Sequence, residues 1–224
     1  MRLYIKTSAS KEIVPFNHLH LLSGTLHKWF GSNNFHDKIS LYSFSMLRGG
    51  DFSNLGLKFN NGATFFISCW EVDKAKLLIQ GIQSSPDLFC GMKVIEITLK
   101  QNPDLYDTSY FQLGSPIFIQ RTIDGNKKRF FYYSDKESSN LLKETLQNKM
   151  KKAGLQVDDT LEIHFDKSYR NKHTKKIDYK KGKRIIQIKA NCCPVIIEGK
   201  METKQFAWCV GLGNSTGIGF GAIK

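Results

Sequence analysis

The sequence predicts an α+β protein built from two consecutive domains with similar plans. Several short segments alternate polar and apolar residues, as half-buried strands do, and a few longer segments have apolar residues at helical spacing. The 224 residues suffice for two domains, each of about 100 residues. Pro, Gly and Asp cluster over residues 102–115. We therefore expect a first domain over residues 1–110 and a second over residues 111–224.

The first half contains predicted elements in the order strand, helix, strand, strand, helix, strand. Pro15 and Asn17 mark the start of the first helix, and the leucines after them have helical spacing. The pair Asn61-Gly62 is a turn signal between two strands. The elements are expected at residues 2–7, 18–30, 41–47, 63–70, 71–80 and 91–99. This order is the ferredoxin-like arrangement.

The second half repeats this outline less regularly. Its clearest element is a helix over residues 138–152, where Leu142, Leu146 and Met150 lie on one apolar stripe. Strands are expected at 116–122, 129–133, 160–165, 184–189, 194–199 and 219–224, with a short helix at 203–210. The last of these strands follows a glycine-rich tail. We therefore expect two tandem ferredoxin-like (βαββαβ) domains with a C-terminal glycine-rich loop.

The composition is strongly basic. The chain has 33 Lys and Arg residues against 20 Asp and Glu, a formal charge of +13. Such an excess attracts polyanions, because each phosphate contact releases condensed counterions. Nucleic acid is the first candidate partner; an anionic membrane surface and a basic protein that binds neither are the alternatives. With no long apolar run and no signal-peptide pattern, we expect no membrane span and a cytoplasmic location.

The five cysteines predict neither disulfides nor a metal site. Their number is odd, Cys192 and Cys193 are adjacent, and no C-x-x-C pair occurs. Several lie in apolar segments, where a free thiol packs as a small hydrophobic group. This usage fits a reducing compartment. We expect no metal and no cofactor.

A basic segment over residues 167–184 concentrates the positive charge. It contains nine Lys or Arg residues and one acid, Asp178, and lies between two expected strands as a long hairpin or loop. A positive ribbon with interleaved Tyr169 and Tyr179 suits a phosphate backbone and base stacking. The alternative is a solvated loop that binds nothing in particular. The candidate nucleic-acid contacts are Lys167, Arg170, Lys172, Lys175, Lys176, Lys180, Lys181, Lys183 and Arg184.

The glycine-rich tail over residues 211–221 is the second candidate contact. Glycines at this density let a backbone approach a ligand closely, and the N–H groups of such loops can bind phosphate. A dinucleotide-binding loop needs a helix after it. The three residues that follow Gly221 in the sequence are too few to form one. The alternative is a tight turn into the last strand. The candidate residues are Gly211, Gly213, Gly217, Gly219 and Gly221.

These motifs resemble those of the CRISPR repeat-processing endoribonucleases, the Cas6 family. The signature that closes those proteins is similar to Gly211-Leu212-Gly213, the polar spacer 214–216 and the run Gly-Ile-Gly-Phe-Gly at 217–221. The Val-Pro-Phe-Asn-His segment at 14–18 and the Leu-Tyr-Ser-Phe-Ser strand at 41–45 resemble the family's N-terminal half. Residues 104–152 contribute little to the resemblance.

The resemblance implies a metal-independent endoribonuclease. Such an enzyme binds CRISPR repeat RNA and cleaves the precursor transcript into guide-RNA units. Attack by the 2′-OH of the RNA gives a 2′,3′-cyclic phosphate and a 5′-OH end. Repeat RNA is the implied partner, and other subunits of a CRISPR effector complex or a second copy of the chain are further candidates.

The resemblance also assigns catalytic roles. His36 lies in the loop after the first helix, where the family has its catalytic histidine, and the imidazole pKa near neutrality suits proton transfer. His27 takes the helix position where many relatives have a tyrosine, as a base or orienting group. The family's usual lysine is replaced by Ser40, so the cationic role falls to Lys38, or to Arg48 or the basic segment. His18 and His20 are expected to be structural or capping residues.

Two other functions are open on the sequence. Position 40 is a serine where the family usually has a lysine, and this difference favours a non-catalytic RNA-binding subunit of a CRISPR ribonucleoprotein. A nucleotide-binding enzyme that uses the tail for a cofactor is the weaker alternative, because the tail has no helix after it.

Overall fold

The computed structural model describes residues 1–31, 40–123, 127–182 and 184–224. In these ranges no helix is long and apolar enough to cross a membrane. The elements, in chain order, are β1 (Arg2–Thr7), α1 (Leu19–Phe30), β2 (Tyr42–Phe44), β3 (Asp51–Ser53), β4 (Gly56–Lys58), β5 (Thr64–Cys69), α2 (Val72–Ser84), β6 (Val94–Lys100), β7 (Tyr110–Phe111), β8 (Gln120–Ile123), β9 (Lys127–Phe130), α3 (Ser138–Lys152), β10 (Glu162–Phe165), β11 (His173–Lys181), β12 (Arg184–Cys192), β13 (Val195–Glu198), α4 (Met201–Val210) and the 3₁₀ turn η2 (Thr216–Ile218).

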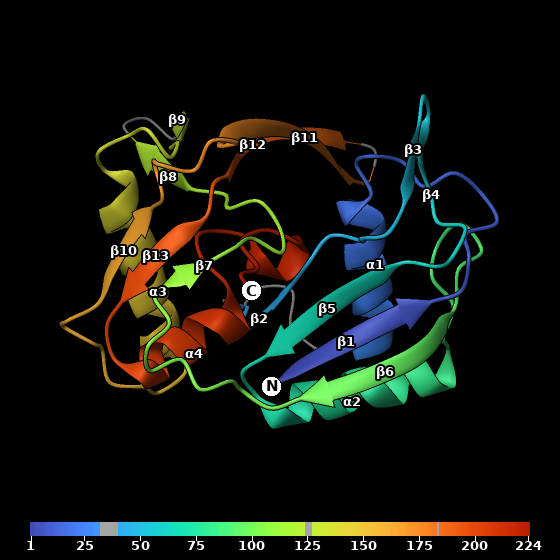
Figure 1. The fold of residues 1–224 in the computed structure, drawn as a ribbon, viewed down its shortest axis with the longest axis horizontal. Coiled ribbons are helices and arrows are strands. Elements are labelled where there is room, and N and C mark those ends of the chain that lie inside the picture. Colours follow the sequence, from blue (N-terminus) through green and yellow to red (C-terminus); the bar gives the residue numbers. More distant parts are fainter. Residues whose placement is uncertain (32–39, 124–126, 183) are drawn as a thin grey trace.

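The N-terminal half is a four-stranded antiparallel sheet covered on one face by two helices. The strand order is β2-β5-β1-β6, and α1 and α2 lie behind the sheet (Figure 1). Leu3 and Ile5 of β1 are fully buried, whereas Tyr4 and Lys6, which alternate with them, face the open side. Leaving aside β3 and β4, this is the predicted ferredoxin-like order, so that prediction is confirmed.

An unpredicted hairpin, β3 and β4, is inserted between β2 and β5. Strand β2 ends at Phe44, earlier than the predicted end at Leu47, and the chain then turns at Gly49, where φ is +89°. The strands of this hairpin have three residues each. Alternation is too short to detect over so few residues.

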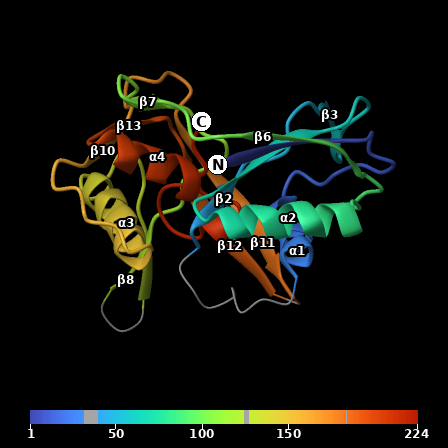
Figure 2. The same ribbon diagram turned by 90° about the horizontal axis from the view of Figure 1, so that it is seen from below.

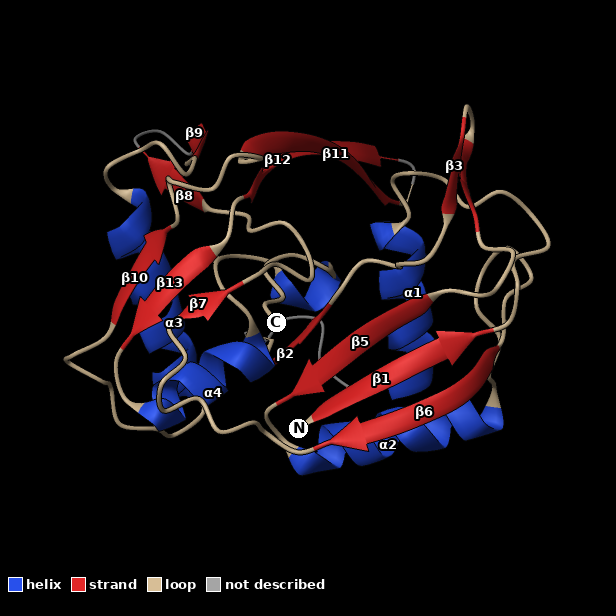
Figure 3. Ribbon diagram, in the orientation of Figure 1, coloured by secondary structure: helices blue, strands red, loops and turns tan. Residues whose placement is uncertain are grey.

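The C-terminal half has the same plan in reduced form. Its sheet has the antiparallel order β10-β13-β7, and α3 lies behind it (Figure 3). Helix α3 has the predicted bounds. The first strand is β7, whereas the sequence predicted a strand over 116–122; β8 comprises Gln120–Ile123 only and pairs with β9. Two residues are too few for a recognisable strand pattern.

The last predicted strand, over residues 219–224, is wrong. Gly219 and Gly221 have φ of +100° and +72°, which no β-strand accommodates. The segment instead pairs irregularly with the chain around β7. The N–H of Lys224 donates to Gln112 (2.8 Å) and the N–H of Gln112 donates back (3.0 Å). Ile223 forms an isolated bridge with Leu113, so the tail still occupies the edge position of the sheet.

The basic segment folds as half of a long hairpin, β11 and β12, which confirms the hairpin alternative. The hairpin is inserted between β10 and β13, but it packs on α1 of the other half, as Figure 2 shows. Ile177 and Ile188 are paired across the hairpin and belong to the N-terminal core. The second half of the sequence therefore completes the core of the first.

Arg2 joins the two halves. Its side chain is 1% exposed, and burial lowers its pKa to about 10, so it stays charged at neutral pH. Its guanidinium donates to Ser68 Oγ (2.7 Å), to the carbonyl of Trp208 (3.0 Å) and to the carbonyl of Ile223 (2.7 Å). It also lies between the rings of Phe66 and Trp208, 3.8 and 3.4 Å from their centroids.

Replacing Arg2 is expected to destabilise the fold strongly. The Arg2→Met variant leaves the carbonyls of Trp208 and Ile223 buried without donors, which should lower the free energy of unfolding by about 2–4 kcal/mol. Arg170→Met, at an exposed position, is the matched control. Urea unfolding followed by tryptophan fluorescence measures both. An equal, small effect of the two substitutions would contradict this account.

Candidate functional site

Two of the predicted catalytic residues, His36 and Lys38, lie outside the described residues, as does Lys183 of the basic segment. The structure does describe what flanks the 32–39 segment. Gly31 follows α1, and Ser40 precedes β2. The candidate site is therefore built from these two ends and from what packs against them.

The glycine-rich tail packs against the start of β2. The hydroxyl of Tyr42 donates to the carbonyl of Gly217 (3.1 Å), and a Cβ on Gly217 would overlap Ser40 Oγ. The Tyr42 ring also contacts Phe30, the last residue of α1, at 5.0 Å between centroids. Turn η2 contacts both α1 and β2. The end of α1, Ser40 and the tail thus meet at one place.

The predicted role of the glycines becomes more specific in this geometry. Gly211, Gly213, Gly217, Gly219 and Gly221 are all buried against protein. The part of the tail that faces solvent is Ser215, with Asn214 half-buried beside it. The glycines therefore let the tail approach β2 closely, and any ligand contact falls to residues 213–216.

A buried ammonium, that of Lys149, holds the two parts of the tail together. Lys149 lies on α3 and is 4% exposed. Its Nζ donates to the carbonyls of Val210 (3.1 Å) and Gly211 (3.0 Å) and to Thr216 Oγ1 (3.2 Å). No carboxylate of the described residues pairs with it. Burial lowers the pKa of Lys149 to about 7.

A polar cleft of about 490 Å³ lies beside this ammonium. Arg121 is fixed in its wall by hydrogen bonds to the carbonyl of Leu141 (3.0 Å) and to Thr145 Oγ1 (3.0 Å). Hydroxyl, amide and cationic groups line the cleft together with one carboxylate, that of Glu144, which lies 3.4 Å from the Arg121 guanidinium, so the cleft suits a polar ligand better than an apolar one. Its lining residues are Ser40, Arg121, Glu144, Thr145, Asn148, Lys149, Gly213, Asn214, Ser215 and Thr216.

The helix histidines have different environments. His27 is half-buried in the last turn of α1, one turn before Phe30. His18, at the N-cap, is fully buried; its Nδ1 lies 3.1 Å from the carbonyl of Pro15 and its Nε2 accepts from the N–H of Leu47 (3.4 Å). Burial lowers the pKa of His18 to about 4, so it stays neutral. This geometry agrees with the structural role predicted for His18.

The hairpin has an inner and an outer face. Ile177 and Tyr179 point inward, and the Tyr179 ring packs against His20 at 6.3 Å between centroids. Tyr179 is 9% exposed and Tyr169 is 37% exposed. Of the two tyrosines predicted to stack on bases, only Tyr169 is therefore accessible.

The predicted cations spread along the hairpin and its base. The backbone of Lys181 lies in β11, and Lys175 and Lys172 are half-buried; Lys172 Nζ donates to the carbonyl of Tyr169 (3.2 Å). The exposed members are Lys167, Arg170, Lys176, Lys180 and Arg184. Among the described residues, none of the predicted cations lines the cleft beside Ser40.

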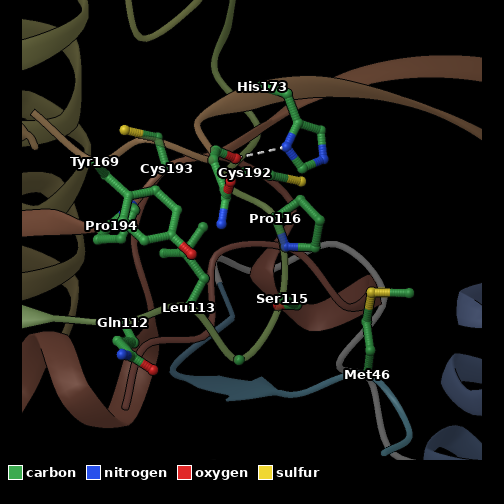
Figure 4. Close-up of a pocket in the computed structure, with 12 residues that line it drawn as sticks. Met46, Gln112, Leu113, Ser115, Pro116, Tyr169, His173, Cys192, Cys193 and Pro194 are labelled. Carbon is green, nitrogen blue, oxygen red and sulfur yellow. Dashed lines mark hydrogen bonds between the residues drawn. The ribbon is translucent and has the colours of Figure 1, made fainter. Parts of the chain in front are cut away.

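A second cavity, of about 310 Å³, lies at the base of the hairpin. Figure 4 shows the Tyr169 ring and the His173 imidazole on either side of Cys192. His173 Nδ1 lies 2.9 Å from the carbonyl of Asn171, which fixes the ring. Arg48, which the sequence offered as a substitute cation, lines a third cavity with Tyr4 and Lys224 rather than the cleft beside Ser40.

Sequence reasoning missed Lys149 and Arg121. A signal for Lys149 was available, because it lies three residues after Leu146 on the apolar stripe of α3. Arg121 had no such signal, because its partners come from separate segments. Among the described residues, no three His, Cys, Asp or Glu side chains gather closely enough to hold a metal ion.

Comparison with known proteins gives a family. The family model described as "CRISPR associated protein Cas6, C-terminal" matches residues 100–224. No curated protein sequence matches the chain significantly.

Three solved structures illustrate the shared fold, and each matches all of this chain. One described as "CRISPR associated protein Cas6" is 18% identical, with a TM-score of 0.83 and 98% of its own chain covered. A Cas6-related protein from Pyrococcus furiosus is 20% identical, with a TM-score of 0.82 and 97% covered. A third, described as "An RAMP protein binding different RNA substrates", is 20% identical, with a TM-score of 0.83 and 98% covered.

The lowered pKa of Lys149 predicts a pH dependence of stability. Between about pH 7 and the ordinary pKa of 10.5, the unfolded chain binds a proton at Lys149 that the folded chain releases. The contribution of Lys149 to the free energy of unfolding therefore rises with pH across that window. Thermal unfolding of the wild type and Lys149→Met at both ends of the window should show that the wild type gains stability relative to the variant as the pH rises. A difference that stays constant with pH would contradict the burial argument.

Proposed function

The chain belongs to the Cas6 family of CRISPR-associated proteins, and we propose that it is a metal-independent endoribonuclease that cleaves CRISPR precursor RNA within its repeats. The observation that carries the proposal is the family match over residues 100–224, together with the packing of the matched tail against Ser40. That packing brings the tail to the end of the loop in which the catalytic histidine is expected. One structural neighbour is described as "An RAMP protein binding different RNA substrates", which supports RNA as the ligand.

The proposed reaction is an internal transesterification. A general base removes the proton of a 2′-OH, the 2′-oxygen attacks the adjacent phosphorus, and the bond to the 5′-oxygen breaks. A general acid protonates that leaving oxygen, so the products are a 2′,3′-cyclic phosphate and a 5′-hydroxyl. We assign these proton transfers to His36 and His27, because His27 lies in the last turn of α1, whose end meets the tail, and His36 belongs in sequence to the segment between Gly31 and Ser40.

The cation that stabilises the phosphorane is assigned to Lys38. Lys149 and Arg121 are poor candidates, because their donors are already bound to carbonyl and hydroxyl oxygens of the protein. They act instead as polar groups that fix the wall of the cleft: Arg121 is also paired with Glu144 (3.4 Å), and Lys149, with its pKa lowered to about 7, is only partly protonated at neutral pH. Ser40, with its hydroxyl beside Gly217, is in a position to donate to a phosphate oxygen in the same cleft.

The second candidate function is a non-catalytic RNA-binding subunit. One observation favours it: Ser40 replaces the lysine that is usual at this position of the family. The exposed hairpin cations and the accessible Tyr169 suit RNA binding with or without cleavage.

Cleavage of repeat RNA in EDTA tests the proposal. The wild type is expected to cut, and His36→Ala is expected to be slower by about 10²–10⁴-fold, because a general acid or base is lost. His27→Ala should also slow the single-turnover rate. His164→Ala, at an exposed site on β10, is the matched control and should cut normally.

The outcomes separate the two candidate functions. RNA with a 2′-deoxy substitution at the cut site should bind with unchanged affinity and stay intact. Wild-type protein that binds the repeat but never cuts it indicates the RNA-binding subunit. Cleavage that needs Mg²⁺, or that survives removal of both histidines, contradicts the mechanism.

A further inference from the structure

Two lysines lie directly opposite each other on the outer face of the hairpin. The register pairs Lys176 of β11 with Lys189 of β12, and both side chains are exposed. Like charges at directly opposed positions destabilise an antiparallel pair. Neither lysine forms an ion pair with a described carboxylate, although Asp178 lies two residues along the same face. The fold therefore holds together two cations that an anion between them would stabilise.

A cleft of about 410 Å³ opens beside this lysine pair. Its opposite wall is the segment before α3, which contributes Tyr132, Tyr133 and Ser134. That wall is tied to the hairpin, because Asn191 Oδ1 accepts from the N–H of Tyr133 (2.9 Å) and Asn191 Nδ2 donates to the carbonyl of Phe131 (3.1 Å). The cleft is thus preformed by contacts between segments that are distant in sequence.

The two tyrosines of the wall are both half-buried but pack differently. Tyr133 packs against the C-terminal core, whereas Tyr132 belongs to neither core cluster. The hydroxyls of Thr174 and Ser134 line the same cleft and are exposed. The cleft therefore offers the ring of Tyr132, which lies outside both core clusters, the hydroxyls of Thr174 and Ser134, and the ammonium groups of Lys176 and Lys189.

We propose that this cleft binds one nucleotide of the RNA, with a phosphodiester between Lys176 and Lys189 and the base stacked on Tyr132. The proposal rests on the proposed function for RNA as the partner and adds a subsite to it. Ammonium groups supply the charge for a phosphate, and an aromatic ring beside them accepts any base. Lys176 was predicted to contact nucleic acid from its charge alone; Lys189 and Tyr132 were not.

The continuation of the outer face favours a polymer over a free phosphate. Lys180 has the same orientation as Lys176 and lies four residues further along β11, or about 13 Å at the rise of a strand. A single phosphate reaches only the lysine pair, whereas a linear polyanion contacts Lys180 as well. The cleft is therefore one subsite of a longer RNA-binding surface along the hairpin.

The lysine pair lowers the stability of the hairpin and raises the affinity for RNA, and both effects are measurable. Lys176→Gln and Lys189→Gln each relieve the repulsion, so each should raise the unfolding midpoint by about 1–2 °C. Each should also weaken binding of repeat RNA that carries a 2′-deoxy at the cut site. The slope of log K against log salt should fall by about 0.7 for each lost contact. Fluorescence anisotropy at several salt concentrations gives both quantities.

Two controls make the assignment specific. The double variant Lys151→Gln/Lys152→Gln removes two positive charges from the exposed end of α3, one more than either test variant, and should leave the affinity nearly unchanged. Tyr132→Ala should weaken binding about fivefold or more, whereas Tyr132→Phe should bind as the wild type does, because stacking needs only the ring.

The possible failures are distinguishable. A wild-type protein that does not bind repeat RNA contradicts the proposed function, whereas the stability gains of Lys176→Gln and Lys189→Gln still report the repulsion. Wild-type binding that these two variants leave unchanged, or that the α3 control weakens equally, overturns the subsite. Equal affinity of Tyr132→Ala and Tyr132→Phe overturns the stacking assignment.

Discussion

The guanidinium of Arg2 is the interaction on which the arrangement of the two halves depends. It lies on the central strand β1, yet two of its three acceptors are the carbonyls of Trp208 and Ile223, at the other end of the sequence. A buried charge is tolerated only where hydrogen bonds and rings replace water. The chain supplies these from both halves, so their relative position is determined by the charge. Tail residues can then lie between the two sheets.

That placement explains the density of glycine in the tail. The segment passes so close to β2 that a side chain at Gly217 would collide with Ser40. Its backbone groups still need partners in a buried place. They receive them from Tyr42, from Lys149 and from the chain around β7. A motif that suggests ligand binding in sequence thus serves first to pack the two halves of the protein together. Only residues 213–216 line the cleft beside Ser40.

The parts of the fold that sequence predicts well are those with long, one-sided periodicity. Helix α3 has its predicted bounds because Leu142, Leu146 and Met150 recur at helical spacing on its buried face. The two-residue strand β7 and the irregular last segment were missed, because pairing partners and positive φ decide them rather than alternation. The candidate site divides similarly. Motif resemblance indicates His36, which lies outside the described residues. Arg121 is identified only by its tertiary hydrogen bonds.

The hairpin shows how one element can serve two surfaces. Its inner face places Ile177 and Tyr179 on α1, which is the helix that presents His27. Its outer face exposes Lys176, Lys180 and Lys189. Because side chains of a strand alternate between faces, neither set of residues constrains the other. The inner residues cannot change without moving α1, whereas the outer ones are open to replacement at little cost in folding. Lysines that lie opposite each other on such a face therefore point to a partner outside the chain.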